Sequence, residues 1–131
     1  MIEQGVIVEL DGRGGPYWPG DLLSGSYRLV GDVTGLEAVE VSVYWFTEGK
    51  GDEDLGVHHV EKRTRADGGG SVPASGRFAT RLPNSPLSYE GVLVKVIWGV
   101  HVRAVLAGGQ RAGDVTFRLG DVRPAGEVLL A

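Results

Sequence analysis

The sequence predicts an all-β fold, an antiparallel β-sandwich of seven to eight strands in two sheets. Apolar residues recur with a period of two in one segment after another, as they do in strands that bury a single face. Clusters of Gly, Pro, Asn and Asp separate these segments at the lengths of hairpins and loops. No stretch keeps the apolar spacing of an amphipathic helix without interruption, so helix should be negligible.

The N-terminal half contains four segments with the character of strands. We expect them at about residues 6–10, 23–29, 39–45 and 55–64. The third alternates most regularly, because its apolar residues share one parity and polar residues hold most of the other. Gly25 weakens the middle of the second strand, and the parity of the fourth is less regular.

The C-terminal half is expected to contain one unusually long strand. We predict strands at about residues 78–82, 90–106 and 115–119, with a candidate edge strand at 127–131. A straight strand of about 17 residues would reach roughly 56 Å, whereas a domain of this size has a radius of gyration of roughly 14 Å. The long strand must therefore bend, most simply near Gly99. The proline-rich corner at residues 83–86 marks the place where the chain crosses to it from the preceding strand.

The predicted core collects the apolar positions of the most regular strands. They are Val41, Val43, Trp45, Phe78, Leu82, Val94, Val96, Trp98, Val100 and Phe117. Both tryptophans continue the apolar parity of their strands, so core packing explains them better than a surface for stacking ligands.

Composition and charge narrow the classes of function. The chain has 131 residues, and we expect one domain over residues 1–131. It has no cysteine, which excludes disulfides and thiolate chemistry and fits a reducing, cytoplasmic location. The net charge is −4 and no basic stripe is present, so nucleic acid is not an expected partner. The N-terminus lacks the features of a signal peptide, and no apolar run reaches the roughly 20 residues that span a membrane.

Residues that could carry chemistry are few, and we predict no catalytic residue, no metal site and no cofactor. His58 and His59 are neighbours on an expected strand, where they would point to opposite faces, and His101 could join only one of them. The acidic loop at residues 48–54 does not have the spacing of an EF-hand. No Gly-x-Ser-x-Gly elbow or other hydrolase motif is present. We therefore expect a protein that is not an enzyme.

Two aromatic residues, Tyr17 and Trp18, lie in a loop rich in Gly and Pro and remain open to interpretation. Aromatic side chains in a loop can stack on a sugar ring, which would make the chain a carbohydrate- or small-ligand-binding sandwich module. They can equally serve a domain that binds proteins, with no ligand of their own. Binding of soluble sugars would separate these alternatives.

Two longer motifs resemble signatures of the arrestin-like family. In "FATRLPNSPLSYEG" a strand ends in an aliphatic-Pro pair, and a proline-containing loop leads to Ser-Tyr-Glu-Gly and then to the long strand. In "YWPGDLLSGSYRL" an aromatic residue and Pro-Gly-Asp precede a small residue, a glycine and alternating apolar positions. The resemblance implies an immunoglobulin-like, arrestin-like β-sandwich that acts as a non-enzymatic scaffold and binds proteins.

The chain also departs from that family. Its relatives mostly join two such sandwiches, whereas 131 residues have room for one. The chain has no Pro-Pro-x-Tyr motif, because Tyr89 is preceded by Pro86, Leu87 and Ser88. The resemblance thus implies a single-domain version of the fold, and it does not imply receptor desensitisation.

The candidate interaction edge consists of the two terminal strands. Its residues are Val6, Val8 and Leu10 near the N-terminus and Val128 and Leu130 near the C-terminus. A sandwich is not a closed barrel, so its outer strands keep unpaired N–H and C=O groups to which a strand of a partner can add. We expect a protein partner of unknown identity, and pairing of two copies would give a homodimer. Alternatively, the two ends pair with each other within one monomer.

Overall fold

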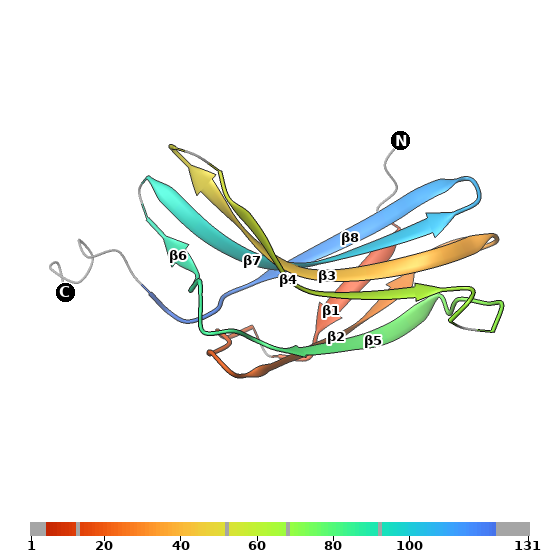
Figure 1. The fold of residues 1–131 in the computed structure, drawn as a ribbon, viewed down its shortest axis with the longest axis horizontal. Coiled ribbons are helices and arrows are strands. Elements are labelled where there is room, and N and C mark those ends of the chain that lie inside the picture. The colour runs from red at the N-terminus through yellow and green to blue at the C-terminus, as the bar shows by residue number, and fades with distance from the viewer. Residues whose placement is uncertain (1–4, 13, 52, 68, 92, 123–131) are drawn as a thin grey trace, which may run out of the picture.

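The computed structural model describes residues 5–12, 14–51, 53–67, 69–91 and 93–122, and this part of the chain contains eight strands and no helix. The strands are β1 (Val6–Leu10), β2 (Leu22–Leu29), β3 (Leu36–Gly49), β4 (Leu55–Thr64), β5 (Ser75–Arg81), β6 (Tyr89–Glu90), β7 (Val94–Leu106) and β8 (Gly109–Phe117). They form two antiparallel sheets packed face to face (Figure 1). The predicted all-β sandwich is confirmed. Within the described residues, no helix has the length and apolar character needed to cross a membrane.

The two sheets differ in size. The smaller has the order β1-β2-β5. In the larger sheet β4, β3 and β7 follow one another, and both β6 and β8 pair with β7 on the side away from β3. β1 and β8 are therefore neighbouring edges on one side of the sandwich, and β4 and β5 are neighbouring edges on the other.

Most predicted strands are confirmed, but the long strand begins later than expected, and the strand expected at 115–119 begins earlier, at Gly109. β6 and β7 form a hairpin in which Gly91 N–H donates to Val94 O at 2.9 Å, so the chain reverses just after Glu90. The prediction of one strand from residue 90 is therefore wrong, and β7 covers Val94–Leu106. β3 and β7 curve together along their length (Figure 1). The predicted strand at residues 127–131 lies outside the described residues.

The proline-containing corner carries the chain from β5 in the smaller sheet to β6 in the larger one. Pro86 O accepts a hydrogen bond from Trp98 Nε1 at 2.7 Å. Trp98 is fully buried, and a buried indole N–H needs such an acceptor. The corner therefore covers Trp98 and satisfies its only polar side-chain atom.

The core lies between the sheets and contains most of the residues predicted for it. Buried members of that prediction are Val41, Val43, Phe78, Leu82, Trp98, Val100 and Phe117. Trp45, Val94 and Val96 are only partly buried. Trp45 packs against the core, whereas the prediction for Val94 and Val96 is wrong. Val94 and Val96 lie at the beginning of β7, where β3 and β7 extend beyond the smaller sheet (Figure 1). Trp45 also covers Gly56 on β4, whose missing side chain leaves room for the indole.

Candidate functional site

β1 and β8 lie side by side, and at one end they touch. A Cβ atom added to Gly113 of β8 would lie 2.2 Å from the carbonyl oxygen of Val6 in β1, so only glycine allows this approach. Beside it, the Arg111 side chain packs against Gly5, and its guanidinium donates to Val30 O at 2.9 Å. We call this contact the closed end of the β1–β8 seam.

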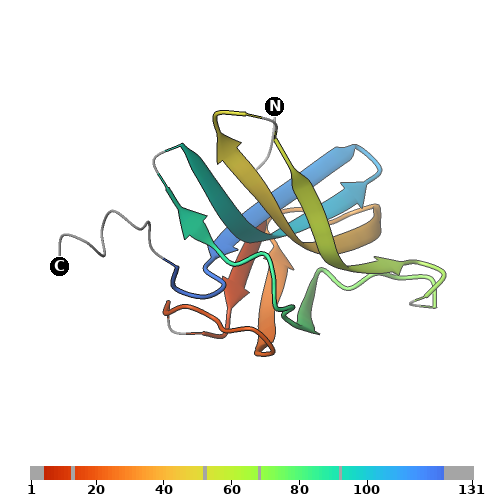
Figure 2. The same cartoon turned by 60° about the vertical axis from the view of Figure 1, so that its left-hand side comes forward.

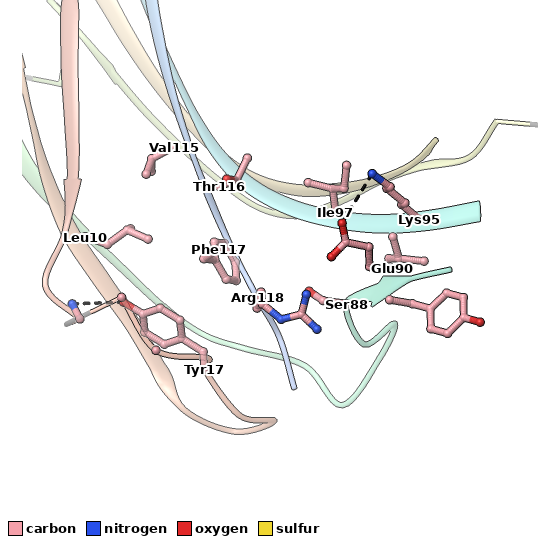
Figure 3. A pocket seen from close by; sticks show the side chains of 15 residues that line it. Leu10, Tyr17, Ser88, Glu90, Lys95, Ile97, Val115, Thr116, Phe117 and Arg118 are labelled. Atoms are coloured by element: carbon pink, nitrogen blue, oxygen red, sulfur yellow. Dashed lines mark hydrogen bonds and ion pairs between the residues drawn. The ribbon is translucent and has the colours of Figure 1, made fainter. Parts of the chain in front are cut away.

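Toward the other end of the seam the strands diverge and leave a groove of about 630 Å³ (Figure 3). One wall is formed by Leu10 and the glycine-containing loop that follows it, and the other by residues 115–118 at the end of β8. Residues of β6 and the beginning of β7 form the far end. We call this cavity the β1–β8 groove, and it is the candidate functional site.

Backbone groups of β1 point into the seam. Leu29, opposite Val6 in the β1–β2 ladder, donates its N–H to Ala74 O at 2.8 Å, away from β1. Val6 is thus in a non-hydrogen-bonded pair, and by alternation Val8 and Leu10 also turn their N–H and C=O groups away from β2. These are the three residues of the predicted N-terminal edge. Within the described residues, no backbone hydrogen bond joins β1 to β8.

The end of β8 presents its backbone to the groove in the same way. Tyr17 N–H donates to Arg118 O at 2.9 Å, so the backbone groups of Arg118 face away from β7. Alternation then directs the N–H and C=O groups of Thr116 toward the groove, and this residue is exposed. Two strand edges therefore face one groove at the open end of the seam.

The loop aromatics Tyr17 and Trp18 have different surroundings. The Tyr17 ring packs edge-on against Phe117 with 5.5 Å between centroids, and its hydroxyl accepts a hydrogen bond from Gly12 N–H at 3.2 Å. Tyr17 therefore forms a fixed wall of the groove. Trp18 is 51% exposed and is not among the lining residues. Only one of the two predicted aromatics belongs to the groove.

Asp11 anchors the end of β1 at the lip of the groove. Ser24 Oγ donates to Asp11 Oδ2 at 2.7 Å, and the Arg77 guanidinium forms an ion pair with the same oxygen. The hydrogen bond from Ser24, followed by that from Arg77, lowers the pKa of the Asp11 carboxyl below its ordinary value. β1 is therefore held to its own sheet at the point where it diverges from β8.

Several polar and charged side chains line the groove. Ser88 is buried, and its Oγ accepts a hydrogen bond from Leu119 N–H at 2.7 Å. The described lining contains no histidine and no cysteine. Lys95 Nζ lies 3.6 Å from Glu90 Oε1, a partly exposed ion pair at the far end. Apolar walls, backbone groups and a few charges suit an extended ligand.

The two neighbouring histidines lie away from the groove. A β-bulge makes His58 the extra residue of β4, so the expectation that His58 and His59 point to opposite faces is wrong. His58 Nε2 lies 2.7 Å from Arg81 O of β5, whereas His59 Nε2 lies 3.0 Å from Glu61 Oε2. The bulge interrupts the alternation on which that expectation depended.

The remaining candidates for metal binding are also dispersed. His101 Nδ1 lies 2.7 Å from Asp114 Oδ1, on β7 and β8. Asp52 of the acidic loop lies outside the described residues. In the described ranges, no three His, Cys, Asp or Glu side chains come together as a metal site requires.

The C-terminal half of the predicted interaction edge, Val128 and Leu130, lies outside the described residues. Sequence reasoning missed the β8 wall of the groove, because residues 115–118 alternate like any other strand. The Ser-Tyr-Glu-Gly motif does mark the far end, since Ser88, Tyr89 and Glu90 line it. That motif was the one available signal for this part of the site.

Comparison by sequence finds no relative: no protein-family model and no curated protein matches the chain. Comparison by structure finds Spo0M, a sporulation control protein from Bacillus subtilis, with a TM-score of 0.62 and 16% sequence identity. The match covers 90% of this chain and 49% of Spo0M, so the chain spans about half the length of that protein. A superoxide reductase (neelaredoxin) from Ignicoccus hospitalis has a TM-score of 0.53 and 8% identity, covering 88% of this chain and 80% of the reductase.

At these identities the likeness concerns the fold. Spo0M has the arrestin-like fold, and nine tenths of the present chain superposes on it. The two antiparallel sheets and the absence of helix from the described residues agree with that architecture. The chain therefore has the arrestin-like β-sandwich fold that its two sequence motifs predicted.

Proposed function

We propose that this chain is a non-enzymatic protein-interaction module that binds an extended segment of a protein partner in the β1–β8 groove. The observation that carries this proposal is that Leu10 and Thr116 direct backbone N–H and C=O groups into one groove without pairing with each other. An unpaired edge accepts an added strand, in which backbone hydrogen bonds give affinity and side-chain pockets give selectivity.

Side chains of the groove would select the bound segment. Leu10 and Phe117 supply apolar walls, while Lys95 and Arg118 contribute two positive charges, compared with one negative charge from Glu90, the one carboxylate among the described lining residues. A bound strand points successive side chains in opposite directions. We therefore expect the preferred segments to alternate apolar residues with acidic or polar ones.

The structural comparisons support the fold, and the regulatory role is part of our proposal. Spo0M is described as a sporulation control protein, and the second structure is described as a reductase. We propose no redox activity for this chain, because its described residues gather no set of metal-binding side chains and the sequence has no cysteine. Superoxide reductase activity in the purified chain would contradict this. The lack of cysteine also fits the cytoplasmic location that we propose.

Selection from a random peptide display library on the immobilised chain tests the proposed function. Selected peptides should alternate apolar and acidic residues, and Thr116→Pro should weaken their binding about tenfold or more, because it removes an N–H that faces the groove. Ala112→Pro is the matched control: Ala112 has the same orientation on the same strand and lies outside the groove lining. Calorimetric titration measures the affinities, and thermal unfolding checks that both variants fold.

Two results would count against the proposal. The selected peptides could bind the Thr116→Pro and Ala112→Pro variants equally well, which would place their site elsewhere. Soluble oligosaccharides could bind the groove where peptides do not, which would favour the carbohydrate-binding alternative.

A further inference from the structure

On the side of the sandwich opposite the groove, one of the two strand edges is covered. Side chains of β4 reach across to the backbone of β5. The Arg63 guanidinium donates to Arg77 O at 2.8 Å, and Glu61 Oε2 accepts a hydrogen bond from Ala79 N–H at 3.3 Å. Charged side chains placed on an edge in this way prevent another strand from pairing with it. The edge of β5 is therefore closed to a partner.

β4 itself has a long outer edge with three exposed apolar side chains. It is the last strand of the larger sheet, runs for 10 residues and contains no proline (Figure 2, yellow-green). Leu55, Val57 and Val60 on its outward face are 69%, 58% and 50% exposed. A long edge strand with exposed apolar side chains is the kind that pairs with a strand of another molecule.

The β-bulge at His58 restricts which strand can pair with β4. Before the bulge the outward side chains are Leu55 and Val57, and after it they are Val60 and Lys62, so the outward parity changes from odd to even. A regular strand cannot follow such a change, because its side chains alternate without interruption. β4 of a second copy, running antiparallel, carries the same change at the same place.

Two β4 strands can pair antiparallel in several registers. Only one of them places each of the four outward side chains of one copy opposite an outward side chain of the other copy. In it Leu55 lies opposite Lys62 of the second copy, and Val57 lies opposite Val60. The two-fold axis then passes through the bulge. Glu53 is exposed and lies two residues before Leu55, so this register brings it diagonally toward Lys62, within reach of long side chains, and the symmetry repeats the pair. The register thus combines apolar contacts with complementary charges.

We infer that two copies of this chain associate through β4, antiparallel about a two-fold axis at His58, which joins their larger sheets edge to edge. This surface lies on the side of the sandwich away from β1 and β8. The dimer therefore leaves both β1–β8 grooves accessible, and it does not depend on the proposed function of the groove.

A charge exchange measured by sedimentation velocity tests this register. Glu53→Lys alone and Lys62→Glu alone each place like charges on both diagonals and should raise the dissociation constant of the dimer about tenfold or more. The double variant, Glu53→Lys with Lys62→Glu, should restore association to near that of the unmodified chain. Both residues are exposed, so none of these changes should alter the fold of the monomer.

Val57→Lys provides a second test, because it puts a charge into the apolar centre of the interface and should give a monomer. Leu22→Lys is its matched control, since Leu22 is 51% exposed and lies on the other sheet. An unmodified chain that stays monomeric up to about 1 mM, or a double variant that associates no better than the single ones, would overturn the inference. The Val57→Lys monomer should still bind the peptides selected for the groove. A loss of the dimer can therefore be told apart from a loss of peptide binding in the groove.

Discussion

β1 and β8 lie side by side, but they touch at one end of the seam and lie apart at the other. At the closed end Gly113 lets the Val6 carbonyl reach β8, and Arg111 fills the space beside it. At the open end Leu10 and Phe117 carry large side chains, and the strands lie apart with a groove between them. Small residues thus line the seam where the two strands touch, and large side chains line it where the groove lies.

The largest loss of stability should come from truncating Trp98, which packs beneath the open end of the seam. Trp98 is fully buried, its ring centroid lies 5.9 Å from that of Phe117, and its N–H binds the proline corner. Trp98→Ala should lower the free energy of unfolding by about 3–5 kcal/mol in urea titrations. Val96→Ala, at a partly buried position of the same strand, should cost about 1 kcal/mol. Equal losses for the two variants would show that the open end does not rest on Trp98.

A second prediction contrasts glycines at the two ends. Gly113→Ala forces a methyl group against the backbone of β1 and should destabilise the fold by about 1–3 kcal/mol. An added Cβ at Gly15, on the groove side, meets no atom within 4 Å, so Gly15→Ala should leave stability unchanged or raise it by up to about 1 kcal/mol. Thermal unfolding of the pair measures the difference. A harmless Gly113→Ala would mean that the closed end is loosely packed.

These contrasts also show what sequence could reveal about the fold. Period-two alternation was enough to place the strands and most of the core, because parity depends on each strand alone. Val94 and Val96 were misplaced because parity says which face a residue occupies and not how far the opposite sheet extends. The reversal at Gly91 was missed because no turn dipeptide precedes the long strand.

The candidate site was harder to predict than the fold. The β1 side of the seam could be named from sequence, since Val6, Val8 and Leu10 form a short strand with little charge, and of these three Leu10 lines the groove. The opposite wall around Thr116 could not, because the groove exists only where two strands far apart in the sequence diverge. The bulge at His58 was equally hidden, since it arises from pairing with β3 and not from the local sequence.

A smaller effect is expected at the wall of the open end. Tyr17→Phe removes the hydroxyl that accepts the Gly12 N–H and keeps the ring against Phe117. Because Gly12 is exposed and can bind water instead, stability should fall by only about 0.5 kcal/mol. Tyr17→Ala also removes the ring and should cost more. Chemical denaturation of the two variants separates the hydrogen bond from the aromatic contact.

The smallest effect concerns how the contribution of Asp11 to stability depends on pH. The folded-state pKa of Asp11 is lowered, so the stabilisation from its contacts is present above the unfolded-state value of about 4 and is lost as the pH falls through the lower folded value. Asp11→Asn should therefore be slightly destabilising at pH 7 and have less effect at pH 2. Melting temperatures of both proteins across this range test the sign. A greater loss in acid than at pH 7 would contradict the assignment.

Amide hydrogen exchange, followed by NMR with and without a display-selected peptide, tests the central claim most directly. If the peptide adds a strand to β8, the Thr116 amide should exchange fast in the free chain and become protected in the complex. The Ala112 amide, which has the same orientation but lies outside the groove lining, should not change. Protection that spares Thr116 and gathers on another surface would show that the open end of the seam is not the binding site.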